Sequence, residues 1–466
     1  MKNRMFLVKM GHFVCTILLF YGAWLLFRYN EFPQVRETGY RYNYFVAIAF
    51  GVGVAFFLQT YNAYLFGYFR IRTLMLAQFI SQFFTVWIIY FGVSVGWNRF
   101  NNPLYFILLL VVYIFLNALF AYYGNKFYFK MNPPRKTILI YRNEKDRRRF
   151  GAITGKPMER LYKIEKEMQF DGSFPEIQNE LDKYDAVFVA GVNSRCRNGI
   201  LKHCEINGIR GFFLPHVGDV IMQGAQHIQA FDSPVLMATR KTLSPEHRAI
   251  KRSIDFMVSL AGLIVLSPAM LVTAVAIKLY DHGPAFYKQV RLTKDGKEFK
   301  IIKFRSMRTD AEKDGIARLS TGEKDDRITP IGRIIRRFRL DEIPQLINVL
   351  KGDMSLVGPR PERPEIAEQY YQSMPEFRLR LQVKAGLTGY AQVYGRYNTE
   401  PYEKLEFDLM YINNMNLLID IELFFATLSI LFLPESTEGV AAGQTTAMDY
   451  ENVADSTEKE DKTVGK

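Results

Sequence analysis

Long apolar stretches dominate the first part of the chain. Four of them, at residues 6–27, 44–66, 73–97 and 103–123, approach the ~20 residues that a helix needs to cross a bilayer core. None of the four contains an acidic residue, and aromatic side chains gather near their ends, as they do at membrane interfaces. The pattern predicts four transmembrane helices within residues 1–130. Because they lack acidic residues, simple anchoring is favoured over a transport role.

Basic residues in the predicted loops set the expected orientation. They cluster before the first helix, between the second and third, and after the fourth, and they are Lys2, Arg4, Lys9, Arg70, Arg72, Lys126, Lys130, Arg135 and Lys136. Three arginines in the first loop, Arg28, Arg36 and Arg41, weaken this bias. Since positively charged loops stay on the cytoplasmic side, we expect the rest of the chain there.

The next segment, residues 131–245, has the pattern of an α/β domain. Apolar runs at 137–141, 186–191 and 211–215 read as buried strands with helical stretches between them, which predicts a parallel sheet. A dinucleotide site would need a glycine-rich turn after the first strand, but the sequence there is Arg-Asn-Glu-Lys-Asp at 142–146. This favours a degenerate, non-catalytic Rossmann-like domain, with a functional nucleotide site as the alternative.

A fifth apolar stretch, residues 254–280, is long enough to span a membrane. Ser267 and Pro268 lie at its centre, where proline removes a helix hydrogen bond and bends the helix. The residues alone favour an ordinary kinked spanning helix. A re-entrant hairpin, which enters and leaves the same leaflet, is the alternative and would keep the remainder of the chain on the cytoplasmic side.

Composition narrows the classes of partner. A net charge of +13 fits anionic lipid headgroups and phosphate substrates, and the membrane stretches favour these over nucleic acid. The three cysteines have no C-x-x-C spacing, so neither a disulfide framework nor a structural zinc site is expected. Residues 437–466 are polar and acid-rich, which predicts a disordered tail.

An acid pair, Asp341-Glu342, opens an apolar pattern of helical spacing. Pro344 fits the first turn of that helix, so Asp341 is expected at or near its N-cap, where a carboxylate stays ionised. An ionised aspartate can attack phosphorus, and Glu342 beside it can hold Mg²⁺ on a diphosphate. Spacing alone favours the plainer alternative, a capping box with two solvated acids.

Basic residues around this pair favour a phosphate site over the capping box. Seven Lys or Arg lie between 291 and 308, and four arginines lie between 333 and 339. A diphosphate with Mg²⁺ needs such charge, as does docking on anionic lipid, and we expect lipid contact for the majority. The turn at 358–361, Gly-Pro-Arg-Pro, presents Arg360 on a backbone that two prolines restrict.

Several motifs occur in one order over residues 250–433. They are Ser267-Pro268, Lys303-Phe304-Arg305-Ser306-Met307, Leu340-Asp341-Glu342, the stretch 351–361, the stretch 386–393 and Asp420. This set resembles the bacterial sugar transferase family, the monotopic phosphoglycosyl transferases. With four helices and a degenerate Rossmann-like domain ahead of it, the chain looks like the large subgroup, similar to undecaprenyl-phosphate glucose or galactose phosphotransferases.

The resemblance implies a mainly α catalytic domain at 246–436, with a re-entrant membrane hairpin at 254–280 that is broken at Ser267-Pro268. It implies an enzyme in the bacterial inner (cytoplasmic) membrane that uses a UDP-sugar, polyprenyl phosphate and Mg²⁺ and binds no nucleic acid; a homodimer is plausible. Asp341 matches the nucleophile and Glu342 the metal-associated acid. Five further positions match substrate-binding residues, and Arg305 of the second motif is grouped with them: Lys303, Arg305, Arg336, Arg360, Arg396 and Asp420.

Two rival functions remain at this stage. A glycosyltransferase that moves only the sugar would release UDP, whereas a phosphoglycosyl transferase releases UMP. A membrane scaffold or sensor would need neither Mg²⁺ nor an intact acid pair, and the intact Asp341-Glu342 and 358–361 motifs disfavour it.

Overall fold

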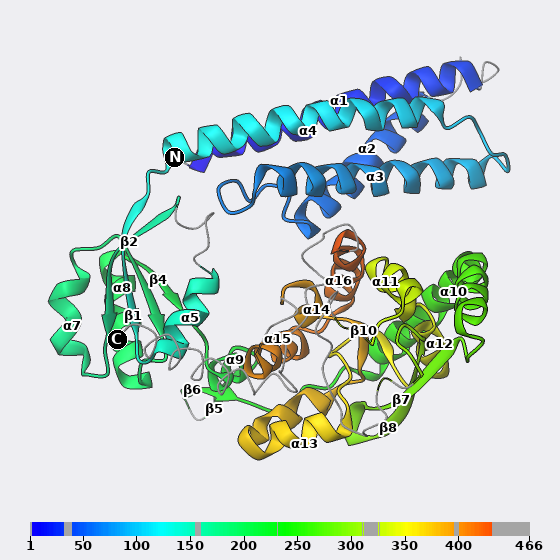
Figure 1. Cartoon of the computed structure of the whole chain (residues 1–466). Helices are drawn as coiled ribbons and strands as arrows, with labels where there is room; N and C mark the ends of the chain where they lie inside the picture. Colours follow the sequence, from blue (N-terminus) through cyan, green and yellow to red (C-terminus); the bar gives the residue numbers. More distant parts are fainter. Residues whose placement is uncertain are drawn as a thin grey trace, which may run out of the picture. The chain divides into compact units, whose positions relative to one another are not determined.

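The computed structural model describes residues 2–31, 40–153, 160–230, 232–309, 311, 325, 327–395 and 400–430 (Figure 1). The chain divides into two compact units, Met1–Leu214 and Pro215–Lys466, which are treated in turn. The first unit holds the apolar helices and an α/β domain. The second holds a mainly helical domain with short two-stranded sheets.

Four long helices form the first part of the N-terminal unit. They are α1 (Lys2–Glu31), α2 (Tyr40–Thr60), α3 (Ile71–Gly96) and α4 (Leu104–Met131). Each is long and apolar enough to cross a membrane, and α1 packs on α2 and α4 while α3 packs on α2 and α4 (Figure 1). The second helix ends at Thr60 rather than at the predicted residue 66, because a turn follows it, with a positive φ at Asn62.

A network of buried polar side chains connects three of these helices. His12 on α1 lies 3.0 Å from Asn117 Oδ1 on α4 and 2.7 Å from the Tyr64 hydroxyl. Asn117 Nδ2 donates to Gln82 Oε1 on α3 at 2.8 Å, and Gln82 Nε2 donates to Thr16 Oγ1 at 3.3 Å. In an apolar environment such pairs fix which helix faces meet. Amides and an imidazole therefore provide polar contacts in a bundle whose predicted spans have no acidic residue.

We expect Asn117→Leu to destabilise the bundle by about 1–2 kcal/mol, because the isosteric side chain leaves His12 and Gln82 without a shared partner. The measurement is unfolding of the purified protein by a denaturing detergent. Asn30→Leu, at an exposed position of α1, is the matched control. Equal stability of the two variants would contradict a structural role for the network.

The α/β domain follows α4. Its strands β1 (Arg135–Tyr141), β2 (Tyr162–Gln169), β3 (Ala186–Ala190) and β4 (Arg210–Phe213) form one parallel sheet in the order β2-β1-β3-β4. The helices between and after them are α5 (Glu144–Ile153), α7 (Phe174–Leu181) and α8 (Ser194–Asn207). The sequence predicted β1, β3 and β4. It missed β2, an edge strand whose alternating Lys and Glu residues are mostly exposed.

The second unit begins before the expected catalytic segment. Helix α9 (Val217–Gln223) and the hairpin of β5 (Gln226–Ala230) and β6 (Ser233–Met237) belong to it. Val217 and Val220 join its main core, and the Val217 amide donates to the Tyr402 hydroxyl at 3.1 Å. Residues 215–237, which the sequence grouped with the α/β segment, therefore pack with the domain that follows.

Helices and two short sheets build the rest of this unit. The elements are α10 (Pro245–Asp281), β7 (Phe286–Leu292), η2 (Lys294–Gly296), β8 (Glu298–Phe304), α11 (Pro330–Arg337), η4 (Leu340–Glu342), α12 (Gln345–Lys351), β9 (Ser355–Val357), α13 (Pro364–Ser373), η5 (Pro375–Gln382), β10 (Gly386–Thr388), α14 (Tyr390–Val393), α15 (Pro401–Asn413) and α16 (Leu417–Ile430). Buried side chains such as Val349, Leu356, Phe377 and Leu405 form its core.

Helix α10 contains the predicted Ser267-Pro268 pair within one continuous helical range. Pro268 has no N–H to bond the carbonyl of Ile264, four residues earlier. The Ser267 hydroxyl donates to that carbonyl at 2.7 Å instead. Large apolar side chains on either side of the pair, Val265 and Val272 among them, are 74% and 69% exposed.

Both halves of α10 are attached to the same domain (Figure 1). In the first half, Arg252 donates to the carbonyls of Val349 and Leu350 at 2.6 Å each, at the end of α12. In the second half, Ile277 packs with Phe304 of β8 and Ile335 of α11. The exposed apolar middle therefore lies between two anchored ends.

Candidate active site

The acid pair lies in a tight turn between α11 and α12. Asp341 and Glu342 belong to the 3-10 turn η4, which Arg339 introduces with a left-handed backbone, φ +52°. The helix begins only at Gln345, with Pro344 as its N-cap. The expected N-cap position of Asp341 is therefore wrong by about one turn, and because α12 has only seven residues, neighbouring charges rather than a helix dipole set the ionisation of the pair.

Glu342 is the centre of a cluster of charges from three separate segments. Its Oε1 atom lies 3.2 Å from Lys303 Nζ on β8 and 2.8 Å from Arg360 Nη2 in the 358–361 turn. The Glu342 and Lys303 side chains are only 15% and 20% exposed, whereas Arg360 is 44% exposed. Of the predicted site residues, the structure thus brings Asp341, Glu342, Lys303 and Arg360 together.

The two adjacent carboxylates are shifted in opposite directions. Burial raises the pKa of Asp341 to about 6, and the charge of Glu342 adds to this, although Lys303, Arg336 and Arg360 partly offset it. Burial also opposes ionisation of Glu342, but Arg360 and Lys303 hold its pKa well below the usual range. Glu342 is thus the permanent anion of the pair, while Asp341 carries the less stabilised charge.

The 358–361 turn is built by two motifs that are distant in sequence. Strands β9 and β10 pair in parallel, and beyond them the Gly358 amide donates to the Thr388 carbonyl at 2.8 Å. The Gly386 amide donates to the Pro359 carbonyl, also at 2.8 Å. A Cβ atom at Gly358 would overlap the Lys384 carbonyl, so glycine is required for this close approach. The 386–393 motif therefore supports the turn that carries Arg360.

Asp420 lies in a second cluster, on α16. Its carboxylate is 2.6 Å from Lys251 Nζ on α10 and 2.8 Å from the Tyr411 hydroxyl on α15. Lys251 and Tyr411 also lie 3.3 Å and 3.1 Å from the carbonyl of Val357, the last residue of β9. Burial raises the pKa of Asp420. These contacts support the strand that leads into the 358–361 turn.

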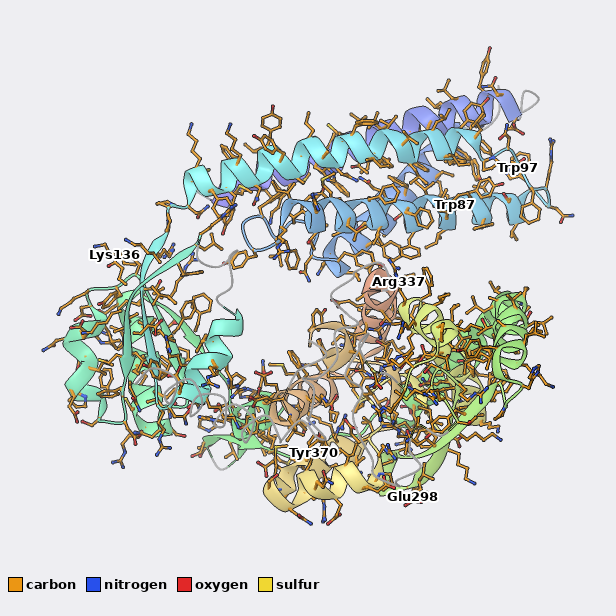
Figure 2. All side chains as sticks on the ribbon, viewed as in Figure 1. Trp87, Trp97, Lys136, Glu298, Arg337 and Tyr370 are labelled. Carbon is orange, nitrogen blue, oxygen red and sulfur yellow. The ribbon has the colours of Figure 1, made fainter. Side chains whose placement is uncertain are left out.

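The remaining predicted positions are placed differently. Arg305 is 7% exposed, and its guanidinium lies against Gly283 in the turn between α10 and β7. Arg336 lies near the end of α11, whose last residue, Arg337, is labelled in Figure 2. The charge of Arg336 favours the ionised form of Asp341. Arg396 lies outside the described residues, so its predicted role stays a prediction.

Sequence reasoning missed a buried ionic network behind the 358–361 turn. Arg291, Glu362, Arg380 and Asp408 form it, with distances between charged atoms from 2.7 to 4.0 Å. Glu362 directly follows the Gly-Pro-Arg-Pro motif, which was a usable signal. Arg380 and Asp408 lie in segments where a charged residue reads as a solvated surface position, so neither could be singled out.

The acid pair fits one mode of Mg²⁺ binding. Among the described residues, no group of three or more His, Cys, Asp or Glu side chains is placed to hold a metal ion. Mg²⁺ commonly binds through one or two carboxylates together with substrate phosphate oxygens and water, which requires no such group. Lys303 and Arg360 both contact Oε1 of Glu342. The residues therefore fit an ion that arrives with a phosphate substrate.

The α/β domain places its own carboxylate where a nucleotide phosphate would bind. In parallel sheets, ligands bind where the strand order reverses, here between the carboxyl ends of β1 and β3. Gly191, directly after β3, has φ +66°, and a Cβ atom there would overlap the Asp146 carboxylate. A negative side chain at this point disfavours a phosphate, which supports the non-catalytic interpretation of the domain.

Comparison with known proteins identifies the family. The bacterial sugar transferase family matches residues 246–434. A UDP-glucose:undecaprenyl-phosphate glucose-1-phosphate transferase from Caulobacter vibrioides is 38% identical over 191 residues, which cover 40% of this chain and 71% of the relative. The chain belongs to the bacterial sugar transferase family. The matched range agrees with the resemblance seen at 250–433, and it contains the whole charge cluster around Glu342.

Two further relatives are also similar to this chain. A UDP-N-acetylgalactosamine-undecaprenyl-phosphate N-acetylgalactosaminephosphotransferase from Aeromonas hydrophila is 40% identical over 188 residues, 40% of this chain and 44% of the relative. A UDP-glucose:undecaprenyl-phosphate glucose-1-phosphate transferase from Escherichia coli K12 is 40% identical over 211 residues, 44% of this chain and 43% of the relative. The chain thus spans less than half the length of these two relatives.

The opposite shifts of the two carboxylates predict opposite effects of neutral substitutions on stability. The pKa of Asp341 is about 6, above its usual 3.8, so ionisation of Asp341 costs stability as the pH rises from about 4 to 6. Asp341→Asn should therefore stabilise the protein by about 1–3 kcal/mol above pH 6, and this gain should vanish below about pH 4.

Glu342→Gln should instead destabilise the protein by about 2 kcal/mol at neutral pH, because Lys303 and Arg360 lose their shared anion. This loss should stay constant between pH 8 and about pH 5 and shrink only below pH 4.5, the usual pKa of the carboxyl, as the pH falls toward the lowered pKa of Glu342. Thermal unfolding of both variants between pH 4 and pH 8 checks the two predictions. Shifts of the same sign at pH 8 would show that the assignment of the two charges is wrong.

Proposed function

We propose that this protein transfers a sugar-1-phosphate from a UDP-sugar to polyprenyl (undecaprenyl) phosphate and releases UMP. Such a reaction is the first step of exopolysaccharide, capsule or O-antigen synthesis. The observation that carries the proposal is the pairing of Asp341, whose pKa is raised, with Glu342, whose charge Lys303 and Arg360 already balance. The undecaprenyl-phosphate sugar phosphotransferases among the relatives support the same donor and acceptor.

Asp341 acts as the nucleophile in this proposal. Its carboxylate oxygen attacks the phosphorus that bears the sugar, and the bond from that phosphorus to the UMP oxygen breaks. An aspartyl-phosphosugar remains. An oxygen of polyprenyl phosphate then attacks the same phosphorus and releases the Asp341 carboxylate. A carboxylate with a pKa of about 6 is mostly ionised at neutral pH and more basic than an ordinary aspartate, which suits nucleophilic attack.

The surrounding cations stabilise the charge that develops on the phosphates. Arg360 presents a planar guanidinium on a rigid turn. Arg360 and Lys303, which lies on β8, both donate to Glu342. We propose Glu342 as the residue that holds Mg²⁺, which supplies positive charge to the leaving phosphate when it is bound. Arg336 on α11 adds a further positive charge near Asp341.

Helix α10 fits a re-entrant position in the bacterial inner membrane, with the catalytic domain on the cytoplasmic face. Its apolar middle is exposed, whereas both halves pack against one domain through Arg252 and Ile277. A helix that returns to its starting side would hold the site level with the lipid headgroups, where the acceptor phosphate lies. UDP-sugars are cytoplasmic, which requires the same side.

The chemistry is tested with purified protein, a panel of UDP-sugars, polyprenyl phosphate and Mg²⁺. We expect UMP as the released nucleotide, and a phosphosugar on Asp341 when labelled donor is given without acceptor. Asp341→Asn should abolish both, a loss of at least about 10³-fold in turnover. Release of UDP would point to a glycosyltransferase, and normal turnover of Asp341→Asn would exclude the covalent route.

The membrane topology is tested by single cysteines at the two ends of α10, Glu246→Cys and His282→Cys. Both should react with a membrane-impermeant maleimide from the same side of sealed vesicles, because a re-entrant helix exposes both ends to the cytoplasm. Lys166→Cys, on exposed β2, marks the cytoplasmic side, and the unsubstituted chain gives the background from its own cysteines. Labelling of the two ends from opposite sides would show an ordinary spanning helix.

A further inference from the structure

Four successive carbonyl groups, at residues 359–362 in and directly after the 358–361 turn, accept hydrogen bonds from other segments. Pro359 accepts from the Gly386 amide at 2.8 Å, and the Glu362 carbonyl accepts from the Leu292 amide at 3.0 Å. Between them, two side chains provide the donors. Arg380 Nη2 donates to the Arg360 carbonyl at 2.8 Å, and Arg291 Nη1 donates to the Pro361 carbonyl at 3.1 Å.

Arg380 is held in a fixed position for this contact. It is 3% exposed, its guanidinium lies 4.7 Å from the centre of the Phe377 ring, and it belongs to η5. Its Nε and Nη2 atoms lie 2.9 Å and 2.7 Å from Asp408 Oδ2 on α15, and Nη1 lies 3.6 Å from Glu362 Oε1. The fork of the guanidinium therefore joins α15, the core and the turn, which the single ammonium of a lysine cannot do.

The charges of this group largely compensate one another. Arg380 faces Asp408, and Arg291 faces Glu362, so neither arginine adds an unbalanced positive charge for a phosphate. Their contacts go to main-chain carbonyls behind Arg360, while the Arg360 guanidinium points the other way, to Glu342. Arg380 and Asp408 therefore reach the site through the position of Arg360.

We propose that Arg380 and Asp408 are positioning residues, which hold the Arg360 backbone so that its guanidinium meets Glu342 and the donor diphosphate. The inference rests on the proposed function for its effect on catalysis. Its geometric part, the fixing of the turn, does not depend on any activity. A displacement of the reacting groups by about 1 Å can lower a rate by about 100-fold, so a loosened turn should be measurable.

The variant that tests this is Arg380→Lys, which keeps the charge and loses the fork. We expect kcat/KM for the UDP-sugar to fall about 10- to 100-fold. Asp408→Asn, of the same shape, should give a smaller loss in the same direction and serves if Arg380→Lys does not fold. The matched control is Arg378→Lys, two residues away on η5, where the guanidinium is exposed over the Tyr371 ring. It should stay within about twofold of the wild type.

A double-mutant cycle separates positioning from general damage to the fold. If Arg380 acts through Arg360, Arg380→Lys should cost no more than about twofold in an Arg360→Ala background. A full additional loss in that background would overturn the inference, because a structural defect would act on both proteins alike.

Amide hydrogen exchange tests the geometric part without any turnover. In Arg380→Lys, exchange should quicken at the three amides that bond into or around the turn, Gly358, Gly386 and Leu292, and stay unchanged in Arg378→Lys. Unchanged exchange at these three amides would overturn the inference even if the enzyme is active. A wild-type protein that releases no UMP would instead contradict the proposed function, while the exchange result would still decide whether Arg380 fixes the turn.

Discussion

The buried charge of Glu342 is the constraint on which the candidate site depends. A carboxylate with so little solvent is stable only if cations compensate it, and the two that do so come from β8 and from the 358–361 turn. This one ionic contact therefore fixes the mutual position of three segments. Burial raises the pKa of Asp341 next to it, and the charge of Glu342 adds to this, because a second negative charge at the same place is harder to form. The burial that makes Glu342 depend on its cations is thus also the main cause of the raised pKa of Asp341.

Part of this arrangement was predictable from the sequence. Apolar length predicted the long helices, and buried β-branched and aromatic runs predicted β1 and β3. These predictions succeed because hydrophobic periodicity is a local property of the chain. The family resemblance assigned Asp341, Glu342, Lys303 and Arg360 to one site, and the structure places these four residues together. The edge strand β2 failed the same test, since an exposed strand with alternating charges lacks the apolar pattern on which strand prediction depends.

Other features depend on contacts that no local pattern encodes. Asp420 was expected among the substrate-binding residues, and that role stays a prediction. Its carboxylate pairs with Lys251, 169 residues earlier in the chain. Arg380 and Asp408 are ordinary charged residues in sequence and become buried partners only in the folded domain. The polar network of His12, Gln82 and Asn117 joins three helices in the same way. Long-range pairing decides the role of each of these side chains.

The hydroxyl of Ser267 has a consequence for the environment in which α10 can contain a proline. A proline leaves one carbonyl without its amide partner, and in hydrocarbon an unmatched carbonyl costs several kcal/mol because no solvent is at hand to bond it. Since the Ser267 side chain bonds that oxygen, the proline leaves no unpaired carbonyl at this point. The hydrogen bond that the proline removes is therefore replaced within α10 itself.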